Sequence, residues 1–194
     1  MATIWAISRG FNPTSGIETG TFLGSSTPYL ASMVTSEMFT IEIQPKTASL
    51  ARERFRLNHL KLPITLKLGD SVNEIQKILS GLNPKTERII AYLDAHWYDA
   101  IPTTAEISAL LSWGGPWIAI IDDFKVESDS GYKYDVYGAV EIGPSIVPDD
   151  SKVCIYVPNE PSSMETGRRK GTGYVCRSSE EFVLREIPEL TKIR

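Results

Sequence analysis

Acidic and hydroxyl side chains follow five apolar segments of the sequence, at the point where each segment ends. They are Glu18 with Thr19, Glu42, Asp70 with Ser71, Asp94 with His96, and Asp122 with Asp123. Carboxylates accept hydrogen bonds from hydroxyl or amine groups and bind hard cations, and an imidazole can move protons near neutral pH. Solubility alone would scatter such residues over both ends of the segments. Their restriction to one end therefore predicts a binding or catalytic site.

The loop after the first segment carries Gly20 and Gly24, which are candidate ligand-binding positions. Glycine is needed where φ is positive or where a ligand approaches the backbone closely. The two residues before Gly24 are Phe and Leu, so the pattern is not G-x-G-x-x-G, which weakens a dinucleotide interpretation. Glu18 would repel a pyrophosphate, whereas it could accept hydrogen bonds from an amine-bearing ligand. The glycine spacing alone is also compatible with a plain strand-to-helix turn.

Glu42 ends the second apolar segment, about 20 residues after the glycine loop. A carboxylate at this place can accept hydrogen bonds from both hydroxyls of a ribose. Asp70 and Ser71 could contact an adenine edge. However, Ser71 with Glu74 three residues later also has the capping-box pattern of a helix start.

The alternation of apolar and helix-like segments predicts how these residues are positioned. Strands are expected at residues 16–19, 38–43, 64–68, 89–93 and 117–121, and helices at 28–36, 47–58, 71–81 and 104–111. Such alternation predicts a parallel sheet covered on both faces and doubly wound by right-handed crossovers. Residues 125–150 have the composition of a long loop, and 153–157 with 172–176 predict a terminal antiparallel strand pair. The predicted fold class is α/β, a doubly wound, mostly parallel sheet with the polar residues at its carboxyl edge.

The composition bounds the remaining possibilities. With 194 residues we expect a single domain over residues 1–194, and 42% hydrophobic residues exclude disorder as the main state. A net charge of −4 argues against non-specific binding to nucleic acid or to a membrane surface. No apolar run approaches the ~20 residues of a membrane span, and no secretion signal is recognisable, so we expect a cytoplasmic protein. Cys154 and Cys176 are too few for a disulfide scaffold and are expected to be free thiols.

Four segments resemble the class I S-adenosylmethionine-dependent methyltransferases, and in particular the catechol-type and macrocin-type small-molecule O-methyltransferases. They are residues 18–26 (ETGTFLGSS), 40–45 (TIEIQP), 92–97 (YLDAHW) and 121–124 (IDDF). Each motif is weak alone, but the four occur in the order and spacing of the family. The resemblance implies a Rossmann-like fold, S-adenosylmethionine as cofactor and a small-molecule methyl acceptor.

The resemblance also implies roles for individual residues. Glu18, Gly20 and Ser26 match positions that hold the methionine part of the cofactor, Glu42 matches the ribose-binding acid, Ser71 matches an adenine contact, and His96 with Trp97 matches a pair packed near the cofactor. Asp94, Asp122 and Asp123 match a divalent-metal site. An Mg²⁺ ion there would bind the acceptor hydroxyl and lower its pKa. Alternatively, one of Asp122 and Asp123 faces the cofactor and the other is solvated.

The general base is open at this point. Catechol-type enzymes have a lysine just after the His-Trp pair, where this sequence has Tyr98 and Asp99. His96 is the candidate base, with Asp94 as a second catalytic residue, although His96 could equally pack on the cofactor. The basic cluster at residues 168–170 is interpreted as a solvated loop that could alternatively bind an acidic acceptor.

We therefore expect an S-adenosylmethionine-dependent O-methyltransferase that acts on a small molecule with divalent-metal assistance. Two alternatives are kept. One is a nicotinamide-dependent oxidoreductase on a similar sheet, and the other is a non-catalytic protein that binds the cofactor or serves as an assembly partner. The sequence leaves open which atom is methylated and whether the chain forms a homo-oligomer.

Overall fold

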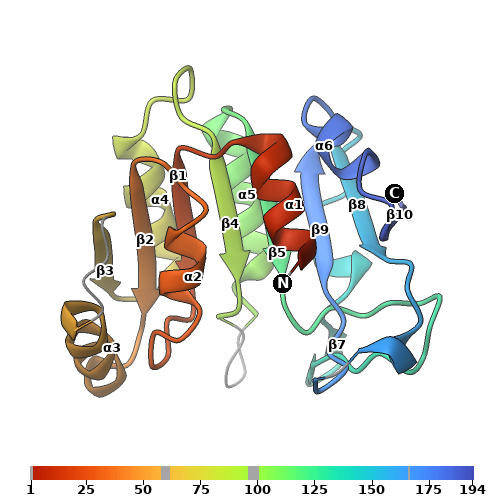
Figure 1. Ribbon diagram of the computed structural model, residues 1–194, viewed down its shortest axis with the longest axis horizontal. Coiled ribbons are helices and arrows are strands. Elements are labelled where there is room, and N and C mark those ends of the chain that lie inside the picture. The colour runs from red at the N-terminus through yellow and green to blue at the C-terminus, as the bar shows by residue number, and fades with distance from the viewer. Residues whose placement is uncertain (1, 58–61, 96–100, 166) are drawn as a thin grey trace.

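The computed structural model describes residues 2–57, 62–95, 101–165 and 167–194, and Figure 1 shows a layered α/β arrangement. The first part of the chain runs through α1 (Ala2–Phe11), β1 (Ser15–Thr19), α2 (Thr27–Ala31), β2 (Glu37–Glu42), α3 (Pro45–Leu57), β3 (Ile64–Leu68), α4 (Ser71–Gly81), β4 (Ile89–Leu93), α5 (Thr103–Trp113) and β5 (Trp117–Ile121). The second part runs through β6 (Val136–Tyr137), β7 (Val140–Glu141), a 3₁₀ turn (Pro144–Ile146), β8 (Val153–Pro158), a second 3₁₀ turn (Ser162–Met164), β9 (Gly173–Arg177), α6 (Glu181–Arg185) and β10 (Leu190–Lys192).

The first five strands form the parallel sheet that the sequence predicts. The strand order across the described sheet is β10-β8-β9-β5-β4-β1-β2-β3, and the part from β5 to β3 is parallel. The chain moves outward from β1 to β3 and then returns to place β4 on the other side of β1. The strand order therefore reverses between β1 and β4, and ligands of open α/β sheets bind outside the carboxyl ends of the strands at such a reversal. The predicted fold class is confirmed.

Helices cover both faces of this sheet, as Figure 1 shows. On one face, α4 buries Ile75 and Ile78, and α5 buries Ile107 and Leu110. On the other face α1, α2 and α6 contribute to a second apolar cluster, and α1 contacts α6. Helix α1 was not predicted from the sequence. Among the described residues, no helix has the length and apolar character needed to span a membrane.

Two local predictions are wrong in detail. The helix predicted at residues 28–36 ends at Ala31, and the chain turns before β2 begins. Helix α4 is capped by Asp70 and not by Ser71, because Asp70 Oδ1 accepts a hydrogen bond from the backbone N–H of Asn73 at 3.2 Å. Glu74 forms an ion pair with Lys77 in the next turn, so the predicted capping box is not formed.

The C-terminal part extends the sheet with antiparallel strands. Strand β9 lies beside β5, β8 beside β9, and β10 beside β8 at the edge. The predicted antiparallel pair is thus confirmed, with β10 as an unpredicted third strand. The segment 125–150, predicted as a loop, contains the β6–β7 hairpin and buries Val126, Ile142 and Ile146 against the sheet, so it forms part of the core.

Candidate functional site

The polar residues that follow the parallel strands lie at one edge of the sheet. The backbone N–H of Asp94 donates to Thr19 O at 3.1 Å, and the backbone N–H of Asp122 donates to Leu93 O at 3.2 Å. The strand pairing therefore continues for one residue beyond β4 and β5. Glu42 ends β2 on the other side of β1, so the strand-end acids meet at the carboxyl edge as the sequence predicts.

Glu18 is fully buried beneath the glycine loop. Its carboxylate accepts hydrogen bonds from the hydroxyls of Ser26 (2.5 Å), Thr27 (2.5 Å) and Thr40 (2.6 Å). Burial raises the pKa of Glu18 above its ordinary value, and the three hydrogen bonds oppose that shift. The carboxylate thus fastens the loop and α2 to β2. Contact of Glu18 and Ser26 with a cofactor stays a prediction.

The two glycines of the loop both have positive φ but serve different contacts. A Cβ on Gly20 would lie 2.3 Å from the carbonyl oxygen of Asp94, so a glycine is required for the loop to close on the end of β4. A Cβ on Gly24 would lie 2.6 Å from the ring of Phe55 on α3. Gly24 therefore has a packing role, and its contact with a cofactor stays a prediction.

Glu42 has both carboxylate oxygens held by backbone donors. The N–H of Phe22 donates to Oε2 at 2.7 Å, and the N–H of Gln44 donates to Oε1 at 2.8 Å. An ionised carboxylate offers about four lone-pair sites, so these two donors leave acceptor capacity for two more. The side chain is therefore oriented in advance and can accept hydrogen bonds from the two hydroxyls of a ribose.

Three exposed apolar side chains adjoin Glu42, and they are not among the site residues predicted from the sequence. Phe22 is 55% exposed, Ile43 follows the acid directly and is 57% exposed, and Leu68, the register partner of Glu42 on β3, is 45% exposed. Exposed apolar groups beside polar ones are typical of a surface that binds a flat apolar ring. The signal in the sequence was Ile43 itself, an apolar residue placed after a strand-ending acid. The adenine contact of Ser71 stays a prediction.

The structure does not support the predicted metal site at Asp94, Asp122 and Asp123. Among the residues that the structure describes, no three acidic, imidazole or thiol side chains are grouped to hold a metal ion. Asp122 accepts hydrogen bonds from the hydroxyl of Tyr92 at 2.8 Å and from the backbone N–H of Asp123 at 3.0 Å. Burial, followed by the charge of Asp122, raises the pKa of Tyr92, so its hydroxyl stays protonated and donates.

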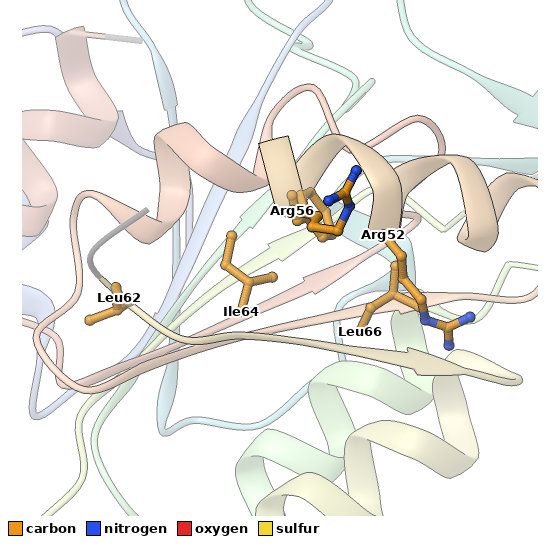
Figure 2. Close-up of a pocket in the computed structure, with 6 residues that line it drawn as sticks. Arg52, Arg56, Leu62, Ile64 and Leu66 are labelled. Carbon is orange, nitrogen blue, oxygen red and sulfur yellow. The ribbon is translucent and has the colours of Figure 1, made fainter. Parts of the chain in front are cut away.

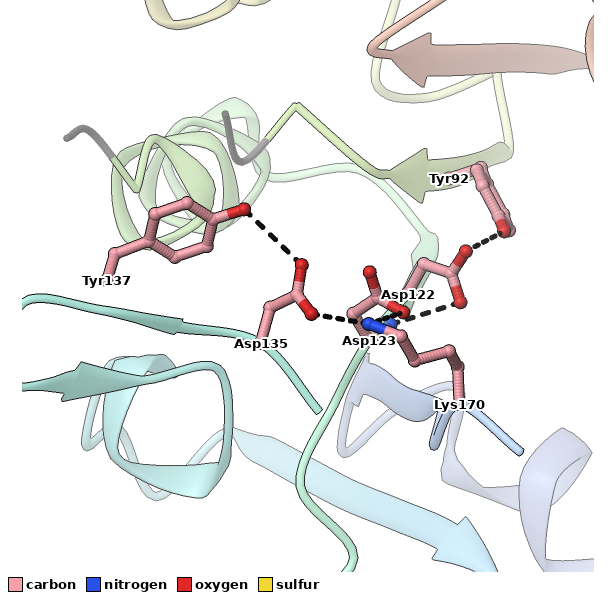
Figure 3. Close-up of polar contacts among 6 residues, drawn as sticks. All are labelled: Tyr92, Asp122, Asp123, Asp135, Tyr137 and Lys170. Atoms are coloured by element: carbon pink, nitrogen blue, oxygen red, sulfur yellow. Dashed lines mark hydrogen bonds and ion pairs between the residues drawn. The ribbon is translucent and has the colours of Figure 1, made fainter. Parts of the chain in front are cut away.

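A lysine occupies the acidic end of β5. The ammonium of Lys170 forms an ion pair with Asp123 at 3.0 Å and a second one with Asp135, as Figure 3 shows. The interpretation of residues 168–170 as a solvated loop is therefore wrong for Lys170. No local spacing could have predicted the cluster, because Asp123, Asp135 and Lys170 come from three separate parts of the chain. His96 and Trp97 lie outside the described residues, and their roles stay predictions.

Two hollows in the surface lie away from these residues. A hollow of about 420 Å³ between α3 and the edge strand β3 is lined by Arg52, Phe55, Arg56, Leu62, Ile64 and Leu66 (Figure 2). A second hollow of about 800 Å³ lies between α4 and α5. No described candidate site residue lines either hollow, so neither is the predicted cofactor site.

Solved structures of methyltransferases have a similar fold. An O-methyltransferase from Streptomyces achromogenes, TomG, solved with S-adenosylmethionine and involved in tomaymycin synthesis, matches with a TM-score of 0.60 and 16% identity over 90% of this chain and 78% of that one. A putative O-methyltransferase from Klebsiella pneumoniae matches with a TM-score of 0.58 and 16% identity over 90% and 77%. An O-methyltransferase from Bacillus cereus in complex with S-adenosylhomocysteine matches with a TM-score of 0.56 and 18% identity over 90% and 78%.

The similarity is one of structure and not of sequence. No protein-family model matches the sequence, and the search of curated proteins gives no significant match. The similarity of fold nevertheless spans 90% of the chain in each of these three structures. The chain therefore has the fold of the class I S-adenosylmethionine-dependent O-methyltransferases.

Proposed function

We propose that this chain is an S-adenosylmethionine-dependent methyltransferase that methylates a hydroxyl group of a small molecule. The observation that carries the proposal is the carboxylate of Glu42. Two backbone N–H groups hold it at the carboxyl end of β2, beside β1, and it can still accept hydrogen bonds from the two hydroxyls of a ribose. Two of the O-methyltransferases with a similar fold were solved with S-adenosylhomocysteine or S-adenosylmethionine, namely those from Bacillus cereus and Streptomyces achromogenes. Neither fact depends on the motif resemblance in the sequence.

Two further observations fit an adenosyl ligand at this edge. Gly20 lets the first loop approach the end of β4 more closely than any side chain would allow. The hydroxyl of Thr19, buried at the end of β1, has no hydrogen-bond partner within the described parts of the chain. A buried hydroxyl without a partner costs free energy, and a polar group of a ligand at the strand ends could provide one.

The proposed chemistry is a direct transfer. S-adenosylmethionine supplies a methyl group on a positively charged sulfur. A bond forms between the acceptor oxygen and the methyl carbon while the carbon–sulfur bond breaks, leaving a neutral thioether, and the hydroxyl proton passes to a base. In this proposal Glu42 would hold the ribose of the adenosyl part and the glycine loop would hold the methionine part, which would bring the reacting atoms together. His96 remains the predicted base.

A divalent metal is not part of this proposal. The donor set at the end of β5 does not fit one, because the carboxylate of Asp123 is already paired with the ammonium of Lys170. We therefore route no step through Mg²⁺.

Isothermal titration calorimetry with S-adenosylhomocysteine tests the cofactor assignment. We expect the wild-type protein to bind, and Glu42→Gln to raise the Kd by about tenfold or more, because an amide has only one acceptor oxygen and cannot receive both backbone donors and both hydroxyls. Failure of the wild-type protein to bind would refute the proposal. Binding of NADH instead, followed by its fluorescence, would favour the oxidoreductase alternative.

Glu37→Gln is the matched control. Glu37 begins the same strand that Glu42 ends, and its carboxylate accepts a hydrogen bond from the hydroxyl of Thr65 at 2.5 Å. The substitution removes the same charge from the opposite end of β2, so it is expected to leave the Kd within about twofold of the wild-type value. An equal loss of affinity in both variants would mean that Glu42 acts through stability and not through a ligand contact.

A further inference from the structure

The backbone that carries Lys170 is fixed on both sides. The backbone N–H of Lys133 donates to Arg169 O at 2.7 Å, and the N–H of Gly171 donates back to Lys133 O at 2.8 Å. The carbonyl of Gly171 accepts a hydrogen bond from the backbone N–H of Phe124 at 2.9 Å. The short segment around Lys170 is therefore joined both to the 125–150 segment and to the residue that follows Asp123.

Asp123 and the residue before Lys170 both have left-handed backbone conformations. The φ angle is +54° at Asp123 and +55° at Arg169, next to Lys170. At Gly171 a Cβ would lie 2.1 Å from the carbonyl oxygen of Phe124. Left-handed conformations cost free energy in residues with a side chain and persist where the surrounding contacts enforce them. The contacts here enforce a conformation that brings the lysine to the acidic end of β5.

The ammonium of Lys170 lies among acidic groups from two elements. Asp123, 17% exposed, follows β5, and Asp135, 33% exposed, precedes the β6–β7 hairpin, whereas the side chain of Lys170 is 28% exposed (Figure 3). Asp122 adjoins the same cluster through its hydrogen bond with the backbone of Asp123. The ammonium of Lys170 thus compensates the charge of Asp123 and Asp135 at the end of β5, where the sequence predicts a divalent metal.

We propose that the Lys170 ammonium is the fixed cation of this site, in the place that a divalent metal would need beside Asp123 and Asp135, so that methyl transfer by this chain uses no bound metal. The inference rests on the proposed methyltransferase function. Mg²⁺ requires oxygen ligands at about 2.0–2.1 Å in an octahedral arrangement, and an ammonium ion-paired to the same carboxylates repels a second cation. The two cations therefore exclude each other.

The charge state of Lys170 agrees with this role. Burial lowers the pKa of Lys170, but the hydrogen bonds and charges of Asp135 and Asp123 together outweigh burial and raise it above its ordinary value. The ammonium of Lys170 is ion-paired with both Asp123 and Asp135, so this geometry gives Lys170 a structural charge and His96 remains the predicted base. An ammonium has three N–H donors, and the side chain of Lys170 is 28% exposed, so Lys170 pairs with the two acids and keeps part of its surface open to solvent.

Binding of Mn²⁺ alone, followed by electron paramagnetic resonance with and without S-adenosylhomocysteine, tests the proposal. The wild-type protein is expected to bind no Mn²⁺ at this site below about 1 mM. Lys170→Met removes the ammonium and leaves its carboxylates uncompensated, so it is expected to bind Mn²⁺ at least about tenfold more tightly than the wild type. Lys170→Arg keeps the charge and is expected to behave as the wild type.

Lys133→Met is the matched control, because Lys133 is an exposed lysine in the segment that pairs with Lys170. It is expected to leave Mn²⁺ binding unchanged. Wild-type binding of Mn²⁺ that is lost in Asp123→Asn would overturn the proposal, and so would a Lys170→Met protein that binds Mn²⁺ no better than the wild type. Circular dichroism shows whether each variant is folded.

The same samples separate this inference from the proposed function. Calorimetry with S-adenosylhomocysteine in EDTA reports only on the cofactor assignment. Absence of that binding, together with the expected Mn²⁺ results, would refute the methyltransferase assignment while leaving Lys170 as the cation of the site. Binding of S-adenosylhomocysteine that requires Mn²⁺ would refute the metal-free arrangement and leave the cofactor assignment in place.

Discussion

The two halves of the carboxyl edge hold their acidic residues in different ways. On the β1–β2 side, Glu18 and Glu42 accept hydrogen bonds from hydroxyls and backbone N–H groups. On the β5 side, Asp123 and Asp135 are ion-paired with Lys170. Neutral donors orient a carboxylate and leave its charge in place, whereas an ammonium compensates it. The first half is therefore suited to bind a ligand through its acids, and the second half presents the lysine.

Gly20→Ala gives the largest expected effect on the β1–β2 side. The new Cβ would lie 2.3 Å from the carbonyl oxygen and 2.8 Å from the carbonyl carbon of Asp94, at a φ of +81°. We expect a loss of about 3 kcal/mol or more in the free energy of unfolding and a loss of binding of S-adenosylhomocysteine. Chemical denaturation and calorimetry measure the two effects.

Gly138→Ala is the control that separates the two effects of Gly20→Ala, the clash of the new Cβ with Asp94 and the strain of a positive φ. Gly138 has a φ of +60°, and nothing lies within 4 Å of the Cβ that would be added. This variant should lose only the conformational part, about 1 kcal/mol, and should bind S-adenosylhomocysteine as the wild type does. If Gly20→Ala destabilised the protein no more than Gly138→Ala, the close approach of the first loop to β4 would not be needed.

Glu18→Gln gives a smaller effect with a characteristic pH dependence. Because the pKa of Glu18 is raised above 4.5 by burial, the folded protein retains a proton just above that pH that the unfolded chain has lost. Unfolding then releases a proton, so this carboxyl makes the free energy of unfolding fall as the pH rises through that range. The variant lacks this contribution and loses about 1–2 kcal/mol near neutral pH from its altered hydrogen bonds.

Urea denaturation of both proteins at about pH 8 and at about pH 5 checks this sign. The wild-type protein should gain stability relative to Glu18→Gln on acidification. A difference between the two proteins that shrinks on acidification would mean that hydrogen bonding outweighs burial at Glu18. In that case the β1–β2 side would resemble the β5 side, where the partners of a carboxylate favour its charged form.

The same contrast explains what the sequence could predict. The parallel sheet, the strand-end acids and Gly20 follow from local patterns, because alternation, glycine and a polar residue at the end of a strand act within a few residues. The interpretation of Lys170 failed because its partners Asp123 and Asp135 are brought to it by the antiparallel extension. The helix α1 and strand β10 were missed because each is short and depends on packing against distant parts of the chain.

The metal assignment lacks support from the structure for a related reason. A run of acids such as Asp122-Asp123 indicates negative charge, but the sequence alone does not tell which cation compensates it. Three carboxylates close in the sequence suggest a divalent metal, but one lysine from another segment can compensate their charge instead. In this chain that arrangement requires left-handed backbone conformations at Asp123 and Arg169, which cost free energy. Charge patterns predict the sign of a partner better than its identity.

The smallest expected effect concerns the strength of the ion pair on the β5 side. Both side chains are partly exposed, 28% for Lys170 and 33% for Asp135, so solvent screens their attraction. A double-mutant cycle with Asp135→Asn and Lys170→Met should give a coupling energy below about 1 kcal/mol, falling further in high salt. A coupling above about 3 kcal/mol would mean that the pair is desolvated in the way of a buried salt bridge. The ion pair of Lys170 would then contribute to the free energy of unfolding by holding the 125–150 segment against β5. The two halves of the edge would differ in the strength of their contacts as well as in the type of donor.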